Sequence, residues 1–212
     1  MKFLNNKNVL CIGAHPDDIE YGMSGTFQKC WNTNFTVVVM SSGGDFDKTS
    51  SVNRNKENIS IWDCFDNVDG FFGSGFVKEQ AEDAMVNFIE TTIMDKSITA
   101  IVTTPQFDSH FEHRKINNLG PALCRRSPIT LIEYRTPSTL NHWIPNYFIN
   151  LNQEDYNKKK DVLKLFKSQQ KAPYFNSKTI DSFHHNFLCS KKGLDLVESY
   201  RIVESCRVGL CT

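Results

Sequence analysis

The chain has 212 residues, of which 40% are hydrophobic and 23% are charged, a size and composition typical of one α/β domain. Its 24 basic residues balance 24 acidic ones, so no net charge attracts the protein to nucleic acid. No apolar run reaches the roughly 18 residues of a membrane helix, and residues 1–14 lack the hydrophobic core of a signal peptide. We therefore expect a single cytoplasmic domain over residues 1–212, with no nucleic-acid partner and no membrane insertion.

Short apolar segments alternate with helical patterns along residues 8–134. The predicted strands are residues 8–14, 35–40, 68–72, 98–103 and 129–134. The predicted helices between them are residues 20–31, 53–65, 79–95 and 113–126. Strands that alternate with helices of this length form a parallel sheet with right-handed crossovers. The fold class that we expect is α/β, a Rossmann-like three-layer sandwich with a mostly parallel central sheet and helices on both faces.

The last third of the chain is less regular. Residues 158–170 show an amphipathic helical pattern, with Val162, Leu165 and Phe166 on the apolar face. We interpret the three consecutive lysines at 158–160 as the solvated face of this helix. For residues 173–175 and 199–203 the pattern leaves loop, strand and helix open.

Polar loops follow the first, second and fourth predicted strands, at residues 15–18, 43–45 and 108–113. Ligands of open α/β sheets bind beyond the carboxyl ends of the strands, where the strand order reverses. A doubly wound sheet places the first and fourth strands side by side. The sequence therefore predicts that residues 15–18 and 108–113 share one cleft.

The side chains of these two loops are typical of a catalytic metal site. Zinc in such a site takes three ligands from histidine and carboxylate side chains and keeps a position for water. Two histidines and an aspartate supply this number, which leaves Asp17 as a base and His110 as a donor to an oxyanion. The alternative is structural, with the His-Pro-Asp-Asp sequence as a helix cap and the second loop as an exposed helix start. The placement of both loops at one sheet edge favours the metal site.

The two loops also carry a resemblance to a known family. Residues 14–18 (AHPDD) and the eight residues after them resemble the first motif of the PIG-L/LmbE-like zinc-dependent N-deacetylases, and residues 110–113 (HFEH) resemble the second. Such proteins carry residues similar to Arg54 and Glu57, to the glycines at 43–44, and to Ser168 and Gln169. The resemblance covers most of the chain up to about residue 170.

The resemblance implies a role for each residue of the two motifs. It makes His15, Asp18 and His113 the ligands of one Zn²⁺ ion per chain, a site that another divalent cation can also occupy. It makes Asp17 the general base. His110 would stabilise the tetrahedral oxyanion and protonate the leaving amine.

Further roles follow from the same resemblance. Arg54 and Asp45 are implied to contact the substrate, commonly through a phosphate or a sugar hydroxyl. Glu112 stands where many members have Asp, and the resemblance makes it a catalytic residue that orients His110. Phe111 replaces the proline of those members, so the acid here has a longer stem and a less rigid neighbour.

The resemblance implies a zinc-dependent hydrolase that removes an N-acetyl group from a small amino sugar. The substrate would be an N-acetylglucosamine-type glycoside, a sugar nucleotide or a glycan precursor, and a homo-oligomer is compatible with this role. The alternative is a catalytically silent sugar-binding or scaffold protein that keeps the same fold. A nucleotide-binding Rossmann protein is disfavoured because the first loop has no G-x-G-x-x-G pattern.

Overall fold

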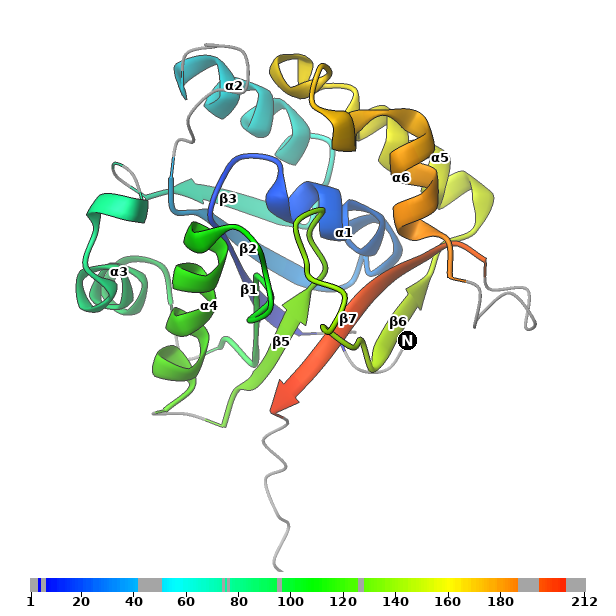
Figure 1. The fold of residues 1–212 in the computed structure, drawn as a ribbon. Coiled ribbons are helices and arrows are strands. Elements are labelled where there is room, and N and C mark those ends of the chain that lie inside the picture. The colour runs from blue at the N-terminus through cyan, green and yellow to red at the C-terminus, as the bar shows by residue number, and fades with distance from the viewer. Residues whose placement is uncertain are drawn as a thin grey trace, which may run out of the picture.

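The structure, a computed structural model, describes residue 4 and residues 7–41, 51–73, 75, 77–94, 97–125, 128–186 and 195–204. Its strands are β1 (Asn8–Gly13), β2 (Asn34–Val39), β3 (Val68–Phe72), β4 (Ala100–Thr103), β5 (Thr130–Tyr134), β6 (Tyr147–Asn150) and β7 (Val197–Glu204). The helices are α1 (Asp18–Lys29), α2 (Ser51–Trp62), α3 (Glu82–Phe88), α4 (Phe111–Cys124), α5 (Gln153–Leu163) and α6 (Ser177–His184). Single turns are η1 (Val77–Glu79), η2 (Ile89–Ile93), η3 (Lys167–Gln169) and η4 (Pro173–Phe175). Figure 1 shows the sheet with helices on both sides.

The strands form one sheet in the order β3-β2-β1-β4-β5-β7-β6. β1 to β5 are parallel, whereas β7 pairs antiparallel with both β5 and β6. The chain runs outward from β1 to β3 and then returns to β4 on the other side of β1. The α/β fold is confirmed, and β1 and β4 lie side by side as predicted.

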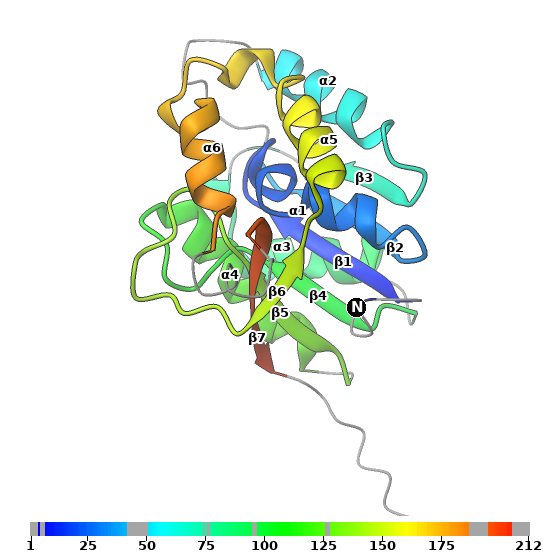
Figure 2. The same ribbon diagram turned by 90° about the vertical axis from the view of Figure 1, so that its right-hand side faces the viewer.

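Successive residues of β1 pack into two different cores. Val9 and Cys11 belong to the core that contains α1, α2, α5 and α6, and Leu10 and Ile12 belong to the core that contains α3 and α4. Figure 2 shows these two groups of helices on opposite faces of the sheet. A strand that is buried on both faces is apolar at every position, which explains the continuous apolar run of residues 9–12.

The two helices that follow the motif loops, α1 and α4, begin earlier than the periodicity predicts. α1 begins at Asp18 instead of residue 20, and α4 begins at Phe111 instead of residue 113. The cause is that Asp17 and His110 occupy the N-cap positions. His110 caps α4 by accepting the backbone N–H of Glu112 at its Nδ1, 3.3 Å away, while Asp17 makes no side-chain cap bond. The structure thus shows no side-chain cap by Asp17 in the first loop, whereas the second loop is a helix start that His110 caps, in addition to any role in the cleft.

The last third differs most from the prediction. α5 covers Gln153–Leu163 instead of residues 158–170, because Asn152 and Asp155 form a capping box that starts the helix earlier. The prediction lacks β6 and α6, whereas β7 settles residues 199–203 as strand and η4 settles residues 173–175 as a turn. Among the helices that the structure describes, none is both long enough and apolar enough to cross a bilayer.

A glycine brings the start of α1 against the end of β5. A Cβ atom on Gly22 would lie 2.5 Å from Cδ2 of Tyr134 and 2.8 Å from the carbonyl oxygen of Arg135. Any side chain at this position would therefore push the helix away from the sheet. The close approach fixes the N-terminus of α1, where Asp17 and Asp18 lie, relative to the strand ends.

One lysine of the triplet contradicts the interpretation of a solvated helix face. Lys159 is buried, and its Nζ donates to the Glu198 carboxylate on β7 and to the Tyr21 carbonyl at 2.6 Å. The same carboxylate accepts the backbone N–H groups of Gly25 and Thr26, at 2.8 and 2.6 Å. Burial lowers the pKa of Lys159, and the charge of Glu198 opposes this shift. The pair joins α1, α5 and β7 inside the core, which a pattern of charges along the sequence does not reveal.

Replacing Lys159 with methionine is expected to lower the free energy of unfolding by about 3–5 kcal/mol, because Glu198 remains buried without its cation. Denaturant unfolding measures this loss. The neighbouring Lys158 supplies the control, since it is half exposed and pairs with Glu154 at the surface. Lys158→Met should change the stability by less than about 1 kcal/mol. Equal effects of the two substitutions would contradict the buried pair.

Candidate active site

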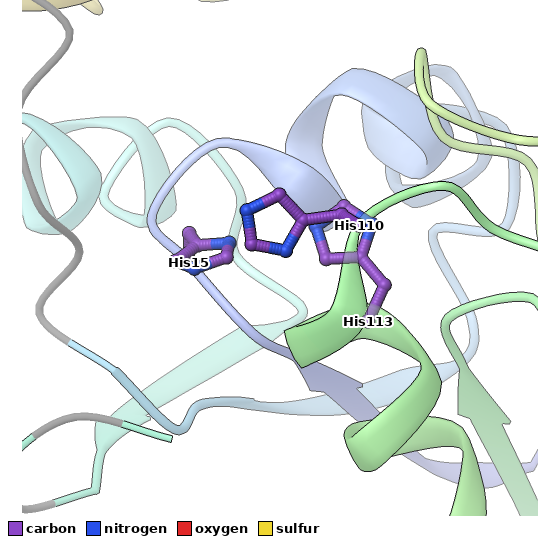
Figure 3. A group of neighbouring side chains, drawn as sticks. All are labelled: His15, His110 and His113. Carbon is purple, nitrogen blue, oxygen red and sulfur yellow. The ribbon is translucent and has the colours of Figure 1, made fainter. Parts of the chain in front are cut away.

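The loop after β1 and the start of α4 meet beyond the carboxyl ends of β1 and β4. Figure 3 shows His15 from the first segment beside His110 and His113 from the second. The ring centroids lie 4.7 Å apart for His110 and His113, 4.8 Å for His15 and His110, and 5.5 Å for His15 and His113. One nitrogen of each ring lies within 4.8 Å of the others, a spacing compatible with metal binding.

Asp18 lies between two of these histidines. Its Oδ2 is 3.3 Å from Nδ1 of His15, and its Oδ1 is 3.2 Å from Nε2 of His113. Donor atoms of a tetrahedral zinc site are about 3.3–3.6 Å apart, given bonds of about 2.0–2.2 Å. The two contacts of Asp18 are close to this spacing, which makes His15, Asp18 and His113 candidate donors to one such cation. His110 is the exposed member of the histidine cluster, which makes it the poorest fourth donor.

The second ring nitrogen of each of these two histidines contacts another carboxylate. Nε2 of His15 lies 2.6 Å from Oε2 of Glu112, and Nδ1 of His113 lies 3.1 Å from Oδ2 of Asp108. The Glu112 side chain thus orients His15, and the expectation that it orients His110 is wrong. The reason is local, because His110 already accepts the backbone N–H of Glu112 as the helix cap.

Charge pairing dominates the titration of this cluster. Burial lowers the pKa of His15, but hydrogen bonds to Asp18 and Glu112 outweigh it and raise the pKa to about 9. Burial also lowers the pKa of His113, while the charge of Asp18 and a hydrogen bond to Asp108 raise it to about 10. Carboxylates that stabilise protonated imidazoles also attract a cation, which releases those protons when it binds.

Asp17 has an unusual backbone and a buried carboxylate. Its φ of 106° is the one positive φ of a non-glycine residue among the described positions, a conformation that costs about 1–3 kcal/mol. Arg54 on α2 stabilises this loop, because its Nη2 donates to the Pro16 carbonyl at 2.6 Å and lies 3.3 Å from Oδ2 of Asp17. Burial raises the pKa of Asp17 to about 7, against the opposing charge of Arg54. A carboxylate with such a pKa can take a proton near neutral pH.

His110 has the properties of a neutral donor. Its Nδ1 accepts a hydrogen bond, so the neutral ring carries its proton on Nε2. Burial and the charges of His113 and His15 lower the pKa of His110, which favours the neutral form. A neutral imidazole N–H can stabilise negative charge that develops on an oxygen atom.

Comparison with known proteins agrees with this geometry. No protein-family profile matches the chain. An uncharacterized deacetylase of Escherichia coli K12, YaiS, is 27% identical in an alignment of 171 positions that covers 76% of this chain and 91% of the relative. The chain is thus similar to a protein named as a deacetylase over most of its length. That likeness agrees with the resemblance of the AHPDD and HFEH motifs.

Two solved structures share the fold of this chain. The N,N'-diacetylchitobiose deacetylase of Pyrococcus horikoshii has a TM-score of 0.75 at 18% identity, over 93% of this chain and 84% of that one. The 4-carboxy-2-hydroxymuconate hydratase GalB of Pseudomonas putida has a TM-score of 0.73 at 11% identity, over 95% and 98%. These likenesses show the fold, which also occurs in a protein named for a different reaction.

A cavity of about 810 Å³ opens onto the site, a volume suited to a small organic ligand. Asp17, Asp18, Arg54 and all three histidines line it. Other lining residues, to which the sequence analysis assigned no catalytic or binding role, are Lys78, Phe111, Pro137, Ser138, Pro173, Tyr174 and Thr179.

Several predicted and unpredicted residues complete the account of the site. Asp45 and the two glycines before it lie outside the described residues, so the role of Asp45 stays a prediction. Glu57 accepts the backbone N–H and the hydroxyl of Ser168, at 3.0 and 2.6 Å, which connects α2 to η3. The hydroxyl of Tyr174 lies 3.5 Å from Oδ2 of Asp17. The sequence analysis placed Asp108 in the polar loop 108–113 without a role of its own. Tyr174 escaped it, because its contact with Asp17 joins residues 157 positions apart.

Proposed function

We propose that the protein is a metal-dependent N-deacetylase that hydrolyses the N-acetyl group of a small N-acetylated amino sugar. The observation that carries this proposal is the position of Asp17. Asp17 is buried and comes directly before the proposed metal donor Asp18 in the chain. Both residues line the cavity, as does His110. A base, a set of cation donors and an oxyanion donor thus border one space, as amide hydrolysis requires. The deacetylase name of the E. coli relative supports the same reaction.

His15, Asp18 and His113 would hold the cation, for which we propose Zn²⁺. A cation of this kind supplies Lewis acidity, which activates water and polarises the amide carbonyl. Asp17 takes the proton of the attacking water at its carboxylate. Arg54 keeps that carboxylate in place through the 3.3 Å contact described above.

His110 acts on the other side of the amide. Its Nε2–H donates a hydrogen bond to the developing oxyanion. The proton that the leaving amine needs is the one that Asp17 took from the attacking water, so Asp17 returns to the carboxylate form. The exposed position of His110 allows it to approach the substrate from the cavity wall. The name of the P. horikoshii structure, N,N'-diacetylchitobiose deacetylase, supports an N-acetylated sugar as the substrate class.

Acetate release from a panel of N-acetylhexosaminides and N-acetylated sugar nucleotides tests the proposal. We expect release with Zn²⁺ and its loss after treatment with a chelator, followed by recovery when metal is returned. A metal-loaded protein that releases no acetate but binds one of the sugars tightly would favour the silent sugar-binding alternative. Turnover of an unsaturated carboxylic acid by water addition, without acetate release, would favour a hydratase.

A further inference from the structure

Asp108 is a buried carboxylate that the proposed reaction does not use. It lies in the loop between β4 and α4, and only 1% of its surface is exposed. Its Oδ1 accepts the backbone N–H of His110 at 2.7 Å, and its Oδ2 accepts the hydroxyl of Thr136 at 2.5 Å. The same Oδ2 lies 3.1 Å from Nδ1 of His113. Burying a carboxylate is costly unless it is hydrogen-bonded, and Asp108 has partners on both oxygens.

The contact with Asp108 determines which nitrogen of His113 is available to a cation. Each ring nitrogen of His113 faces a carboxylate, Nδ1 that of Asp108 and Nε2 that of Asp18. A cation shared with Asp18 would replace the proton on Nε2, while Asp108 accepts a hydrogen bond from Nδ1–H and keeps the hydrogen there. Nε2 then presents its lone pair, and this nitrogen is the one that lies 3.2 Å from Asp18. A carboxylate that fixes the tautomer and angle of a ligating histidine strengthens metal binding.

We infer that Asp108 is the positioning residue that holds His113 in its metal-binding tautomer and orientation. The inference rests on the proposed function only in that the site holds a cation. Glu112 stands in the matching relation to His15, so each of the two histidine ligands has a carboxylate behind it. Asp108 differs from Glu112 because it also accepts a hydrogen bond from Thr136, which belongs to another loop.

Asp108 also connects His113 to the cavity wall. The segment after β5 is held by Thr136 on the carboxylate and by a bridge between Asp108 and Thr139. Ser138 of this segment lines the cavity, and its hydroxyl lies 3.2 Å from Nδ1 of His113. The Asp108 carboxylate therefore fixes the position of His113 relative to the segment of the cavity wall that contains Ser138.

Zinc affinity tests this inference without a substrate. Competition with a chromophoric chelator should show that Asp108→Asn and Asp108→Ala bind Zn²⁺ about 10–100-fold more weakly than the parent. The visible spectrum of bound Co²⁺ should change in both variants, because the orientation of His113 alters the ligand field. Thr136→Val is the matched control, since it removes a hydroxyl from the same carboxylate but leaves its contact with His113. Parental Zn²⁺ affinity and Co²⁺ spectrum in a folded Asp108→Asn would overturn the inference.

The wild-type protein provides a second test that needs no variant. Nitrogen-15 NMR of the imidazole rings in the zinc-loaded protein should show His113 protonated at Nδ1 and metal-bound at Nε2. Protonation at Nε2 with metal at Nδ1 would overturn the inference, even if every Asp108 variant failed to fold. Both readouts are independent of acetate release. A protein with the expected tautomer and zinc affinity but no deacetylase activity would refute the proposed function and leave the role of Asp108 intact.

Discussion

Replacement of Asp17 with asparagine is expected to reduce turnover about 10²–10⁴-fold, the contribution of one general base. Asparagine keeps the shape of the side chain but cannot take the proton of the attacking water. It is also among the residues that best tolerate positive φ, so the backbone at this position survives the change. The proposed metal donors are untouched. Acetate release under saturating substrate measures the turnover, and elemental analysis measures the metal content, which should not change.

The matched control for this variant is Asp63→Asn. Asp63 is exposed and lies just after α2, away from the residues that line the cavity. The same chemical change there should leave turnover and metal content at the parental level. Full activity of Asp17→Asn would contradict its assignment as the base, whereas loss of metal along with activity would assign Asp17 to the metal site instead.

Replacement of His113 with alanine is expected to abolish stoichiometric metal binding, from about one ion per chain to a small fraction of that. His113 is buried, and its ring faces Asp18 on one side and Asp108 on the other. Removing it therefore leaves two donors where catalytic zinc needs three. Acetate release should fall with the metal content.

A histidine outside the donor set supplies the control. His142 is exposed and its ring packs on Phe107, so His142→Ala should retain metal and activity. Circular dichroism of both variants separates loss of metal from loss of fold. A folded His113→Ala protein with a full complement of metal would contradict the proposed ligand set. The milder His113→Gln serves the same purpose if the alanine variant does not fold.

The part of the fold that a sequence reveals is the part with strong periodicity. β1 and β4 are apolar at successive positions, and the convergence of the loops that follow them depends only on strand order. The strand β6 and the helix α6 escaped because they span only four and eight residues, too short a stretch for a periodic pattern to stand out from the polar residues around it. Tertiary packing, which sequence patterns do not record, determines these elements.

The residues that form the site were easier to predict than the contacts that each of them makes. The assignment of Glu112 to His110 came from the family resemblance, whereas in the structure the Glu112 carboxylate contacts His15 and only its backbone N–H contacts His110. Asp108 lies in the polar loop predicted to border the cleft but received no role of its own, because an aspartate in a loop has many ordinary roles and Thr136 lies 28 positions away. Lys159 was misassigned since charge alone suggested exposure.

The contact between His15 and Glu112 joins residues that are 97 positions apart in the chain. Closing so long a loop carries an entropic cost that only the completed β1–β4 pairing offsets. Residues 14–18 and 108–113 are therefore assembled into one centre only in molecules whose sheet is complete. The turnover of a preparation would therefore be proportional to its content of folded molecules. A partly folded chain would lack the complete centre and would not react.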